Sequence, residues 1–479
     1  MKPFLKQTWA VSAVLINMVG QGILLSYTTS LLPALQAPDS PIPTDLDTAS
    51  WLSSSVGISG IPGFFMSSTL MEAYGRKVAH FIIMMPGLIG WLLIYFGNNI
   101  PVLMIGRILG GMSAGGTVAL GAIVIGEYSS PKYRGMYLNM KTASVCLGGM
   151  LVHILGHFYN WRTVALQATI PYIISMAIIS TWPESPAWLI SKQQYEQSEK
   201  NFYFLRGKTE ESYRELENMM QSQTNRVATK TKELTFTDKL VDFLKKFTKK
   251  NFLKPLFILL NGTILLETCG RHIFPAYALQ IIAEITGSKS QSFYYTMCID
   301  VIITVSAVCS SILVKVMKRR TLLFSTGFAA FFVLIIVCAY LFLVAQGVIP
   351  DKYHWVPIAL FVVYFILANL GCTPIPLAFL GELFPLEHRG AGSAVAGIFM
   401  SVILMLGLLL TPHLLAKIAV HGTFAVFGII MGISLAILYV TLPETKDKTL
   451  QEIEDYFNYG KFKDFKNVEE PDVKTKMLK

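Results

Sequence analysis

Apolar segments long enough to cross a lipid bilayer recur along the whole chain. A helix needs about 20 apolar residues to span the hydrocarbon core. Only 15% of the 479 residues are charged, against roughly 25% in soluble proteins. We therefore expect an all-α membrane protein embedded in the lipid bilayer, because a spanning backbone must satisfy its own hydrogen bonds. Twelve spans are predicted, at residues 9–35, 51–70, 78–97, 101–125, 137–158, 163–182, 252–284, 291–315, 321–346, 355–380, 391–414 and 422–441.

Basic residues gather in alternate loops of this pattern. One side holds Arg76, Lys77, Lys132, Arg134, the Lys-rich stretch 192–254, Lys315, Lys318, Arg319, Arg320 and Arg389. The opposite loop 36–50 has no Lys or Arg and contains Asp39, Asp45 and Asp47. The positive-inside rule then predicts that both termini are cytoplasmic. The same loops explain the net charge of +10, so we expect no nucleic-acid partner.

Charged motifs occur twice, in the same order and with similar offsets. The pairs are Glu127 to Gly135 with Glu382 to Gly390 in the frame E-x6-R-G, Pro183-Glu184-Ser185 with Pro443-Glu444-Thr445, and Tyr74 to Lys77 with Met317 to Arg320. Such a duplication predicts two pseudo-symmetric six-helix bundles, an arrangement that resembles the major facilitator fold. The expected parts are an N-terminal bundle 1–186, a cytoplasmic helical linker 187–250, a C-terminal bundle 251–445 and a cytoplasmic tail 446–479.

Glu and Arg at the cytoplasmic helix ends suit contacts that break and reform, because a partly hydrated ion pair contributes only modestly. We expect ion pairs among Glu127, Arg134, Glu382 and Arg389, together with Glu184 and Glu444. Gly75, Gly135 and Gly390 would allow tight turns there. Alternatively, these charges only set topology and cap helices. The candidate gate residues are Glu72, Arg76, Glu127, Arg134, Glu184, Arg319, Glu382, Arg389 and Glu444.

Several motifs together resemble the sugar porter family. They are Gly106-Arg107 with Gly110-Gly111, the two E-x6-R-G frames, PESPAWL at 183–189, Pro374-Ile-Pro376 with Glu382-Leu-Phe-Pro385, and PETKDKTL at 443–450. The resemblance runs from Val19 to Glu454 and is strongest to the insect facilitated trehalose transporter-like group. It implies a monomeric plasma-membrane carrier that moves a sugar (a hexose or a disaccharide such as trehalose) by alternating access, without a cofactor.

The same resemblance places the substrate residues, and here the chain departs from the family. The family's QQxxGxN pattern on the seventh span reads Leu266, Glu267, Gly270 and His272. Thr142 stands where hexose carriers have Gln, and Asn369 where they often have Glu. Tyr277 keeps the aromatic residue of the extracellular gate, whereas Leu377 replaces the Trp of the tenth span. The implied substrate-binding residues are Thr142, Glu267, His272, Tyr277 and Asn369.

Ionisable residues in the middle of spans seven and eight need partners or water, because a lone charge in the membrane is costly. We interpret Glu267, Arg271, His272 and Asp300 as a polar cluster facing the central cavity. Glu267 and Arg271 are four residues apart, so Arg271 is expected to be neutralised by Glu267 or by Asp300. The alternative is a purely structural ion pair that holds spans seven and eight together.

Coupling is predicted from the first span, where Thr28 follows Tyr27. Proton-coupled sugar porters carry an Asp beside that Tyr, so the resemblance favours facilitative uniport. The alternatives are a proton-coupled or non-sugar carrier that titrates Glu267, His272 or Asp300, and a non-transporting sugar sensor. No metal-ligand spacing, nucleophile motif or phosphate loop suggests an enzyme or a metal site.

Overall fold

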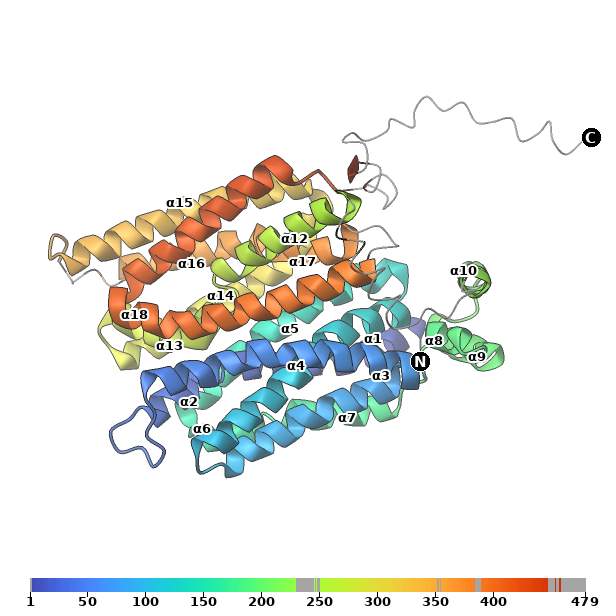
Figure 1. The fold of residues 1–479 in the computed structure, drawn as a ribbon, viewed down its shortest axis with the longest axis horizontal. Coiled ribbons are helices and arrows are strands. Elements are labelled where there is room, and N and C mark those ends of the chain that lie inside the picture. Colours follow the sequence, from blue (N-terminus) through green and yellow to red (C-terminus); the bar gives the residue numbers. More distant parts are fainter. Residues whose placement is uncertain are drawn as a thin grey trace, which may run out of the picture.

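The computed structural model describes residues 2–229, 250–350, 355–383 and 389–446, with residues 245, 247, 353, 453, 456 and 457. Its helices run side by side in one elongated bundle (Figure 1). The helices are α1 (Pro3–Ser26), α2 (Thr28–Leu35), α3 (Leu46–Phe96), α4 (Ile100–Tyr128), α5 (Pro131–Phe158), α6 (Trp161–Gln167), α7 (Ile170–Ser180), α8 (Pro186–Ser191), α9 (Tyr195–Arg206), α10 (Glu210–Thr229), α12 (Lys250–Thr268), α13 (Ile273–Thr286), α14 (Lys289–Val316), α15 (Arg319–Ala345), α16 (Trp355–Gly371), α17 (Pro374–Glu382) and α18 (Arg389–Thr441).

The span count agrees with twelve membrane crossings. In the described part of the chain, 10 helical stretches are long and apolar enough to cross a membrane. Two of them, Leu46–Phe96 and Val395–Thr441, are 51 and 47 residues long. Each contains one non-helical residue, Gly75 in α3 and Ala419 in α18. Each therefore holds two spans, and 10 + 2 gives twelve.

The chain reverses direction within α3 at Gly75, where the backbone requires glycine. Gly135, where a second tight turn was expected, lies in a helix and does not need glycine. Gly75 has φ 87° and ψ 178°, a region that is essentially restricted to glycine. A Cβ there would lie 2.5 Å from Oε2 of Glu184, so the turn also needs the missing side chain. The expectation of a tight turn at Gly135 is wrong, because α5 already begins at Pro131 and Gly135 lies within it.

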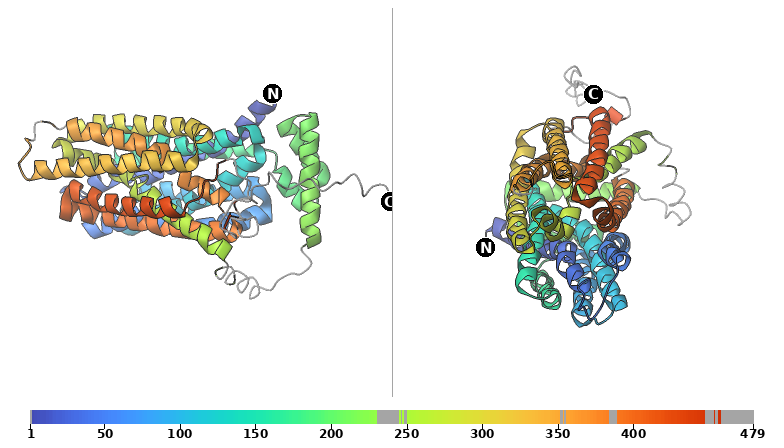
Figure 2. Two further views of the ribbon diagram at one scale, coloured as in Figure 1. Left: turned by 90° about the horizontal axis from the view of Figure 1, so that it is seen from above. Right: turned by 90° about the vertical axis from the view of Figure 1, so that its left-hand side faces the viewer.

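The helices form two groups that lie against each other. α3 packs on α4 and α1 packs on α5 and α7 in the first half of the chain, while α12 packs on α18 and α15 on α16 in the second. Figure 2 shows the first half in blue to green beside the second half in yellow to red. The two halves meet through α3 against α18 and α5 against α14.

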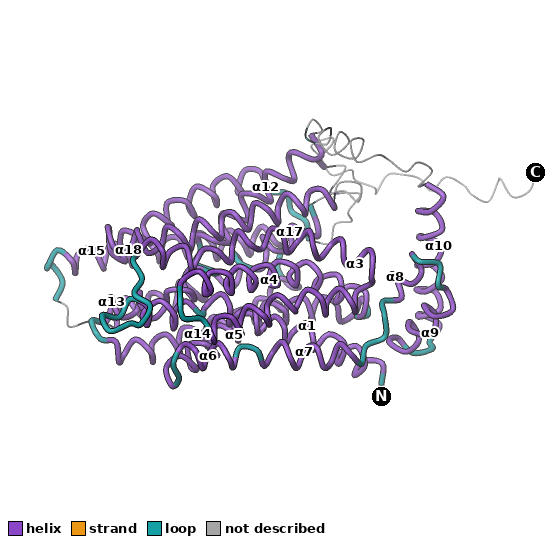
Figure 3. The backbone as a smooth tube through the Cα atoms, turned by 60° about the horizontal axis from the view of Figure 1, so that its bottom comes forward, coloured by secondary structure: helices purple, strands orange, loops and turns teal. Residues whose placement is uncertain are grey.

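The two ends of the bundle differ. Helices α8, α9 and α10 lie beyond one end, close to the start of α1 (Figure 3). We call this the linker end, and the opposite end, where α2 ends at Leu35 and α3 begins at Leu46, the loop end. α9 is fixed to the bundle by Arg206, whose guanidinium donates to the carbonyls of Tyr128 and Ser129 at 3.2 and 2.6 Å.

Candidate functional site

The seventh span is interrupted in its middle. α12 ends at Thr268 and α13 begins at Ile273, and between them Gly270 adopts φ 84°. Non-helical backbone at membrane depth is tolerated only inside protein or beside a cavity. The break holds Arg271 and His272, which line a cavity together with residues of α1, α5 and α14. The polar residues expected on this span therefore lie at a gap between two helices and not along one helical face.

Glu267 and His272 form a buried pair across this break. Nδ1 of His272 lies 2.9 Å from Oε1 and 3.0 Å from Oε2 of Glu267. The Glu267 residue is 1% exposed. A buried carboxylate requires such a partner, because desolvation of an unpaired charge is costly. Two of the residues predicted to bind substrate are thus brought into contact with each other.

Arg271 does not pair with a carboxylate, so the expected Glu267–Arg271 or Asp300–Arg271 pair is wrong for this structure. In the described residues, the one hydrogen bond of its guanidinium runs from Nη1 to Sγ of Cys146, at 3.1 Å. The i,i+4 argument fails because the chain leaves the helix after Thr268, so the two side chains no longer share a face.

Asp300 has a partner that was not expected from the sequence. Oδ2 of Asp300 on α14 lies 2.6 Å from Nδ1 of His153 on α5. The other ring nitrogen of His153 lies 3.0 Å from the carbonyl oxygen of Pro275. These contacts connect the two halves of the chain. The signal was available, since His153 is an ionisable residue in a predicted span, and such residues seek partners.

A small cavity lies beside the break in the seventh span. Its volume is about 30 Å³, enough for one or two water molecules and too small for a sugar. Arg271, His272 and Asp300 line it, as expected for the central cluster, whereas Glu267, the fourth expected member, is not among its lining residues. The remaining lining residues are Gly22, Leu25, Ser26, Val145, Cys146, Gly149, Pro275 and Ile303.

The other residues predicted to bind substrate lie apart from this pair. The Tyr277 hydroxyl is 2.7 Å from both Oγ of Ser53 and the carbonyl oxygen of Leu408, towards the loop end. Asn369 donates to the carbonyl of Phe365 at 2.9 Å, inside α16. Thr142 is half-buried on α5. Within the described residues, no hydrogen bond joins these three side chains to Glu267 or His272.

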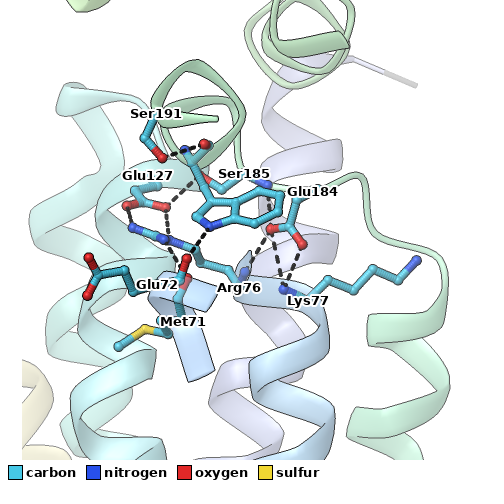
Figure 4. Close-up of polar contacts among 9 residues, drawn as sticks. Met71, Glu72, Arg76, Lys77, Glu127, Glu184, Ser185 and Ser191 are labelled. Carbon is cyan, nitrogen blue, oxygen red and sulfur yellow. Dashed lines mark hydrogen bonds and ion pairs between the residues drawn. The ribbon is translucent and has the colours of Figure 1, made fainter. Parts of the chain in front are cut away.

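At the linker end, Arg76 and Glu127 form a two-pronged ion pair (Figure 4). Nε and Nη2 of Arg76 donate to Oε2 and Oε1 of Glu127, at 2.8 and 2.6 Å. Ser185 donates to Oε2 of Glu127 at 2.5 Å. Glu127 thus pairs with Arg76, and no described ion pair links it to Arg134. Glu72 faces solvent, and its carbonyl accepts from the Trp188 indole at 3.2 Å.

Glu184 caps the start of the helix that follows Gly75. Its carboxylate accepts hydrogen bonds from the backbone N–H groups of Arg76 and Lys77, at 2.8 and 3.2 Å. An anion is favoured at the amino end of a helix, where N–H groups lack intrahelical partners. Burial raises the pKa of the Glu184 carboxyl above its usual range, although these hydrogen bonds act in the opposite direction.

The second half repeats this arrangement. The Glu444 carboxylate accepts from the backbone N–H groups of Arg319 and Arg320, both at 3.0 Å. The Arg320 guanidinium donates to the carbonyls of Leu442 and Tyr439. The predicted gate side chains of Glu382 and Arg389 lie outside the described side chains, as do residues 230–244 of the predicted linker and the tail beyond Phe457.

The described residues contain no group of three or more His, Cys, Asp or Glu side chains that could hold a metal ion. The small cavity is instead lined by the guanidinium of Arg271, the carboxylate of Asp300 and the imidazole of His272, and the latter two are paired with His153 and Glu267. Such groups bind hydroxyls, carboxylates or protons.

A family model described as sugar (and other) transporter matches residues 26–457. Among curated proteins, the chain is 28% identical to a facilitated trehalose transporter Tret1 of Drosophila yakuba, over 94% of this chain and 51% of that protein. It is 26% identical to the Tret1 of Culex quinquefasciatus, over 94% and 85% of the two. The chain spans about half the length of the first of these relatives.

Solved structures confirm the fold. The major facilitator superfamily proton:xylose symporter XylE, bound to 6-bromo-6-deoxy-D-glucose, matches with a TM-score of 0.74 at 18% identity, over 94% of this chain and 99% of that chain. The inward-open conformation of XylE from E. coli matches with a TM-score of 0.72 at 17% identity, over 93% and 98%. At these identities the likeness shows the twelve-helix major facilitator fold alone.

Proposed function

The chain belongs to the sugar (and other) transporter family, and we propose on that premise that it carries a sugar (a hexose or a disaccharide such as trehalose) across the plasma membrane by alternating access. The supporting observation is the interrupted seventh span, which holds Glu267 and His272 at the centre of the fold. Discontinuous helices at the midplane are typical of transporter binding sites. The facilitated trehalose transporters among its relatives favour a sugar as the solute.

Contacts between the halves at the loop end support alternating access. Tyr277 of the second half lies 2.7 Å from Ser53 of the first. Thr28 of the first half donates to the carbonyl of Ala276 in the second, at 2.9 Å. These contacts must break when the solute enters from the loop end. Since the central cavity has only about 30 Å³, the solute-binding state requires the halves to move apart.

The proposed substrate-binding residues are Thr142, Glu267, His272, Tyr277 and Asn369. Carboxylate and imidazole groups suit hydroxyl ligands, because the carboxylate accepts and the imidazole does either. The proposed gate residues are Glu72, Arg76, Glu127, Arg134 and Glu184 in the first half and Arg319, Glu382, Arg389 and Glu444 in the second. The gate contacts act on conformations and do not touch the solute, so variants at the gates should change the rate more than the affinity.

We further propose the division into bundles 1–186 and 251–445, with a linker 187–250 and a tail 446–479. The repeated Glu184 and Glu444 contacts support the two-fold internal relation. The Lys- and Arg-rich linker-end loops support cytoplasmic termini. The proposed carrier is a monomer, since each chain of this fold contains both halves of the solute path.

Uptake of labelled solutes by a transport-null cell that expresses the chain tests this function. Glucose and trehalose should enter until the concentrations are equal, and a protonophore should not change the rate, because Thr28 carries no titratable proton. Cells with the empty vector are the control. Accumulation that collapses with the proton gradient would reassign the mechanism to proton symport. Absence of saturable uptake, with normal surface levels, would remove the sugar-carrier proposal.

A further inference from the structure

Arg271 is a cation at the centre of the fold that has no anionic partner among the described residues. Both nearby carboxylates already have imidazole partners, Glu267 with His272 at 2.9 Å and Asp300 with His153 at 2.6 Å. Within the described part of the chain, the Arg271 guanidinium forms no salt bridge and donates only to Sγ of Cys146. A thiol is a weak acceptor, and a guanidinium has five N–H donors that stay charged in proteins. Its hydrogen-bonding capacity is therefore largely unused.

A second arginine, Arg107, has the contacts that are expected of a structural arginine. The guanidinium of Arg107 on α4 is fully buried, and its nitrogens donate to the carbonyls of Leu24, Leu52 and Ser53 at 2.7, 3.1 and 3.4 Å. Arg107 thus ties α4 to the first and second spans through oxygen acceptors. No oxygen of the described residues accepts a hydrogen bond from Arg271. A purely structural arginine would be expected to have such acceptors.

The unused donors of Arg271 border open space. Arg271 lines the central cavity with His272 and Asp300. No nitrogen of Arg271 belongs to the buried side-chain nitrogen and oxygen atoms that lack a hydrogen-bond partner. The guanidinium is therefore accessible to a ligand in the cavity. Its position beside His272, which is also a proposed substrate residue, places it within the path of the solute.

We propose that the solute carries an anionic group and that Arg271 binds it, so that the carrier takes a sugar acid, such as an aldonate or uronate, in preference to the neutral sugar. The inference rests on the proposed function and specifies its substrate class. A planar guanidinium matches a carboxylate through two parallel hydrogen bonds. In a cavity shielded from water, the missing counter-ion raises the affinity for an anion and gives a neutral sugar no equivalent gain.

The test compares glucuronate, its neutral isostere glucuronamide, and glucose, by uptake in transport-null cells and by binding to the purified full chain. We expect the wild type to bind glucuronate at least 10-fold more tightly than glucuronamide, and to transport it. Arg271→Gln should abolish this preference by weakening only the acid. Arg271→Lys keeps the positive charge but loses the two parallel donors of the guanidinium, so a reduced preference should remain. This variant also keeps the test valid if Arg271→Gln fails to fold. Arg214→Gln is the matched control, because this arginine lies on α10 beyond the bundle, paired with Glu210 at 2.9 Å, and its loss should leave the preference unchanged.

The outcomes separate this inference from the proposed function. Uptake of glucose without a preference for glucuronate over glucuronamide would overturn the inference and leave the sugar carrier in place. A preference that survives in Arg271→Gln would also overturn it, because the anion would then bind elsewhere. If wild-type chain at the cell surface takes up none of the three compounds and no trehalose, the sugar-carrier proposal fails together with this refinement.

Discussion

His153 and Asp300 join the two halves of the molecule, with Nδ1 of one 2.6 Å from Oδ2 of the other. The side chains are 0% and 6% exposed, so both groups are largely shielded from bulk water. Because His153 also lies 3.0 Å from the carbonyl oxygen of Pro275, it contacts both the eighth span and the second part of the seventh. The pair should stabilise the conformation in which α5 and α14 are in contact.

Removing one member of this pair should destabilise the protein. Asp300→Asn or His153→Asn should each lower the free energy of unfolding by about 3–5 kcal/mol, because a buried polar or charged partner is left unpaired. The double variant should cost less than the sum of the two single variants. Thermal denaturation of the purified chain in detergent measures the cycle.

A matched control lies one turn away on the same helix. The Thr296 hydroxyl is buried and has no hydrogen-bond partner among the described residues, so Thr296→Val should be neutral or slightly stabilising. Additive effects of the His153 and Asp300 substitutions would show that the two residues contribute independently, against this interpretation.

Gly75 should tolerate no side chain. Gly75→Ala forces φ 87° and ψ 178° on alanine, which costs about 1–3 kcal/mol, and it also displaces the Glu184 carboxylate. We expect lower stability and slower transport. Gly135→Ala is the control, since Gly135 is helical and a Cβ added there would meet nothing within 4 Å. That change should stabilise α5 by about 0.5–1 kcal/mol. Equal melting temperatures for the two variants would contradict the strain argument.

The fold was largely predictable, because the length and apolarity of each span and the repeated motifs can be read directly from the sequence. All twelve predicted spans correspond to helices, and the repeated Glu184 and Glu444 motifs have the same backbone contacts. The breaks within spans were not predicted. The end of α12 at Thr268 depends on Gly270, whose positive φ the apolar pattern does not reveal.

The pairing of side chains was less predictable than their depth in the membrane. The sequence placed Glu267, Arg271, His272 and Asp300 near the centre, and Arg271, His272 and Asp300 line one cavity. The predicted partners of Arg271 and Asp300 were wrong, because the prediction assumed an unbroken helix and considered only spans seven and eight. His153 comes from span five, so only the three-dimensional packing of α5 on α14 brings it to Asp300.

The pH dependence of stability should carry a contribution from Glu184. Burial raises its pKa in the folded protein, so the folded state binds more protons than the unfolded state between the usual and the raised pKa. Stability from this group is then greatest at low pH and falls as the pH rises through the raised pKa. Melting curves from pH 4 to 8 should show this fall for the wild type relative to Glu184→Gln, which cannot titrate. Parallel curves for the two proteins would rule out the contribution.

The last prediction concerns the closure at the loop end. Tyr277→Phe removes the hydroxyl that lies 2.7 Å from Ser53 Oγ and from the Leu408 carbonyl oxygen. A hydrogen bond of this kind contributes about 0.5–1.5 kcal/mol, so the population open at the loop end should rise roughly 2- to 10-fold. A cysteine placed at Leu52, which is 0% exposed, should react correspondingly faster with an impermeant thiol reagent added outside cells. Tyr340→Phe is the matched control, because the hydrogen bond described for that hydroxyl, to the carbonyl of Tyr353, lies within the second half, and this variant should leave the rate unchanged. An unaltered rate in Tyr277→Phe would mean that other contacts, such as Thr28 with Ala276, hold this end closed.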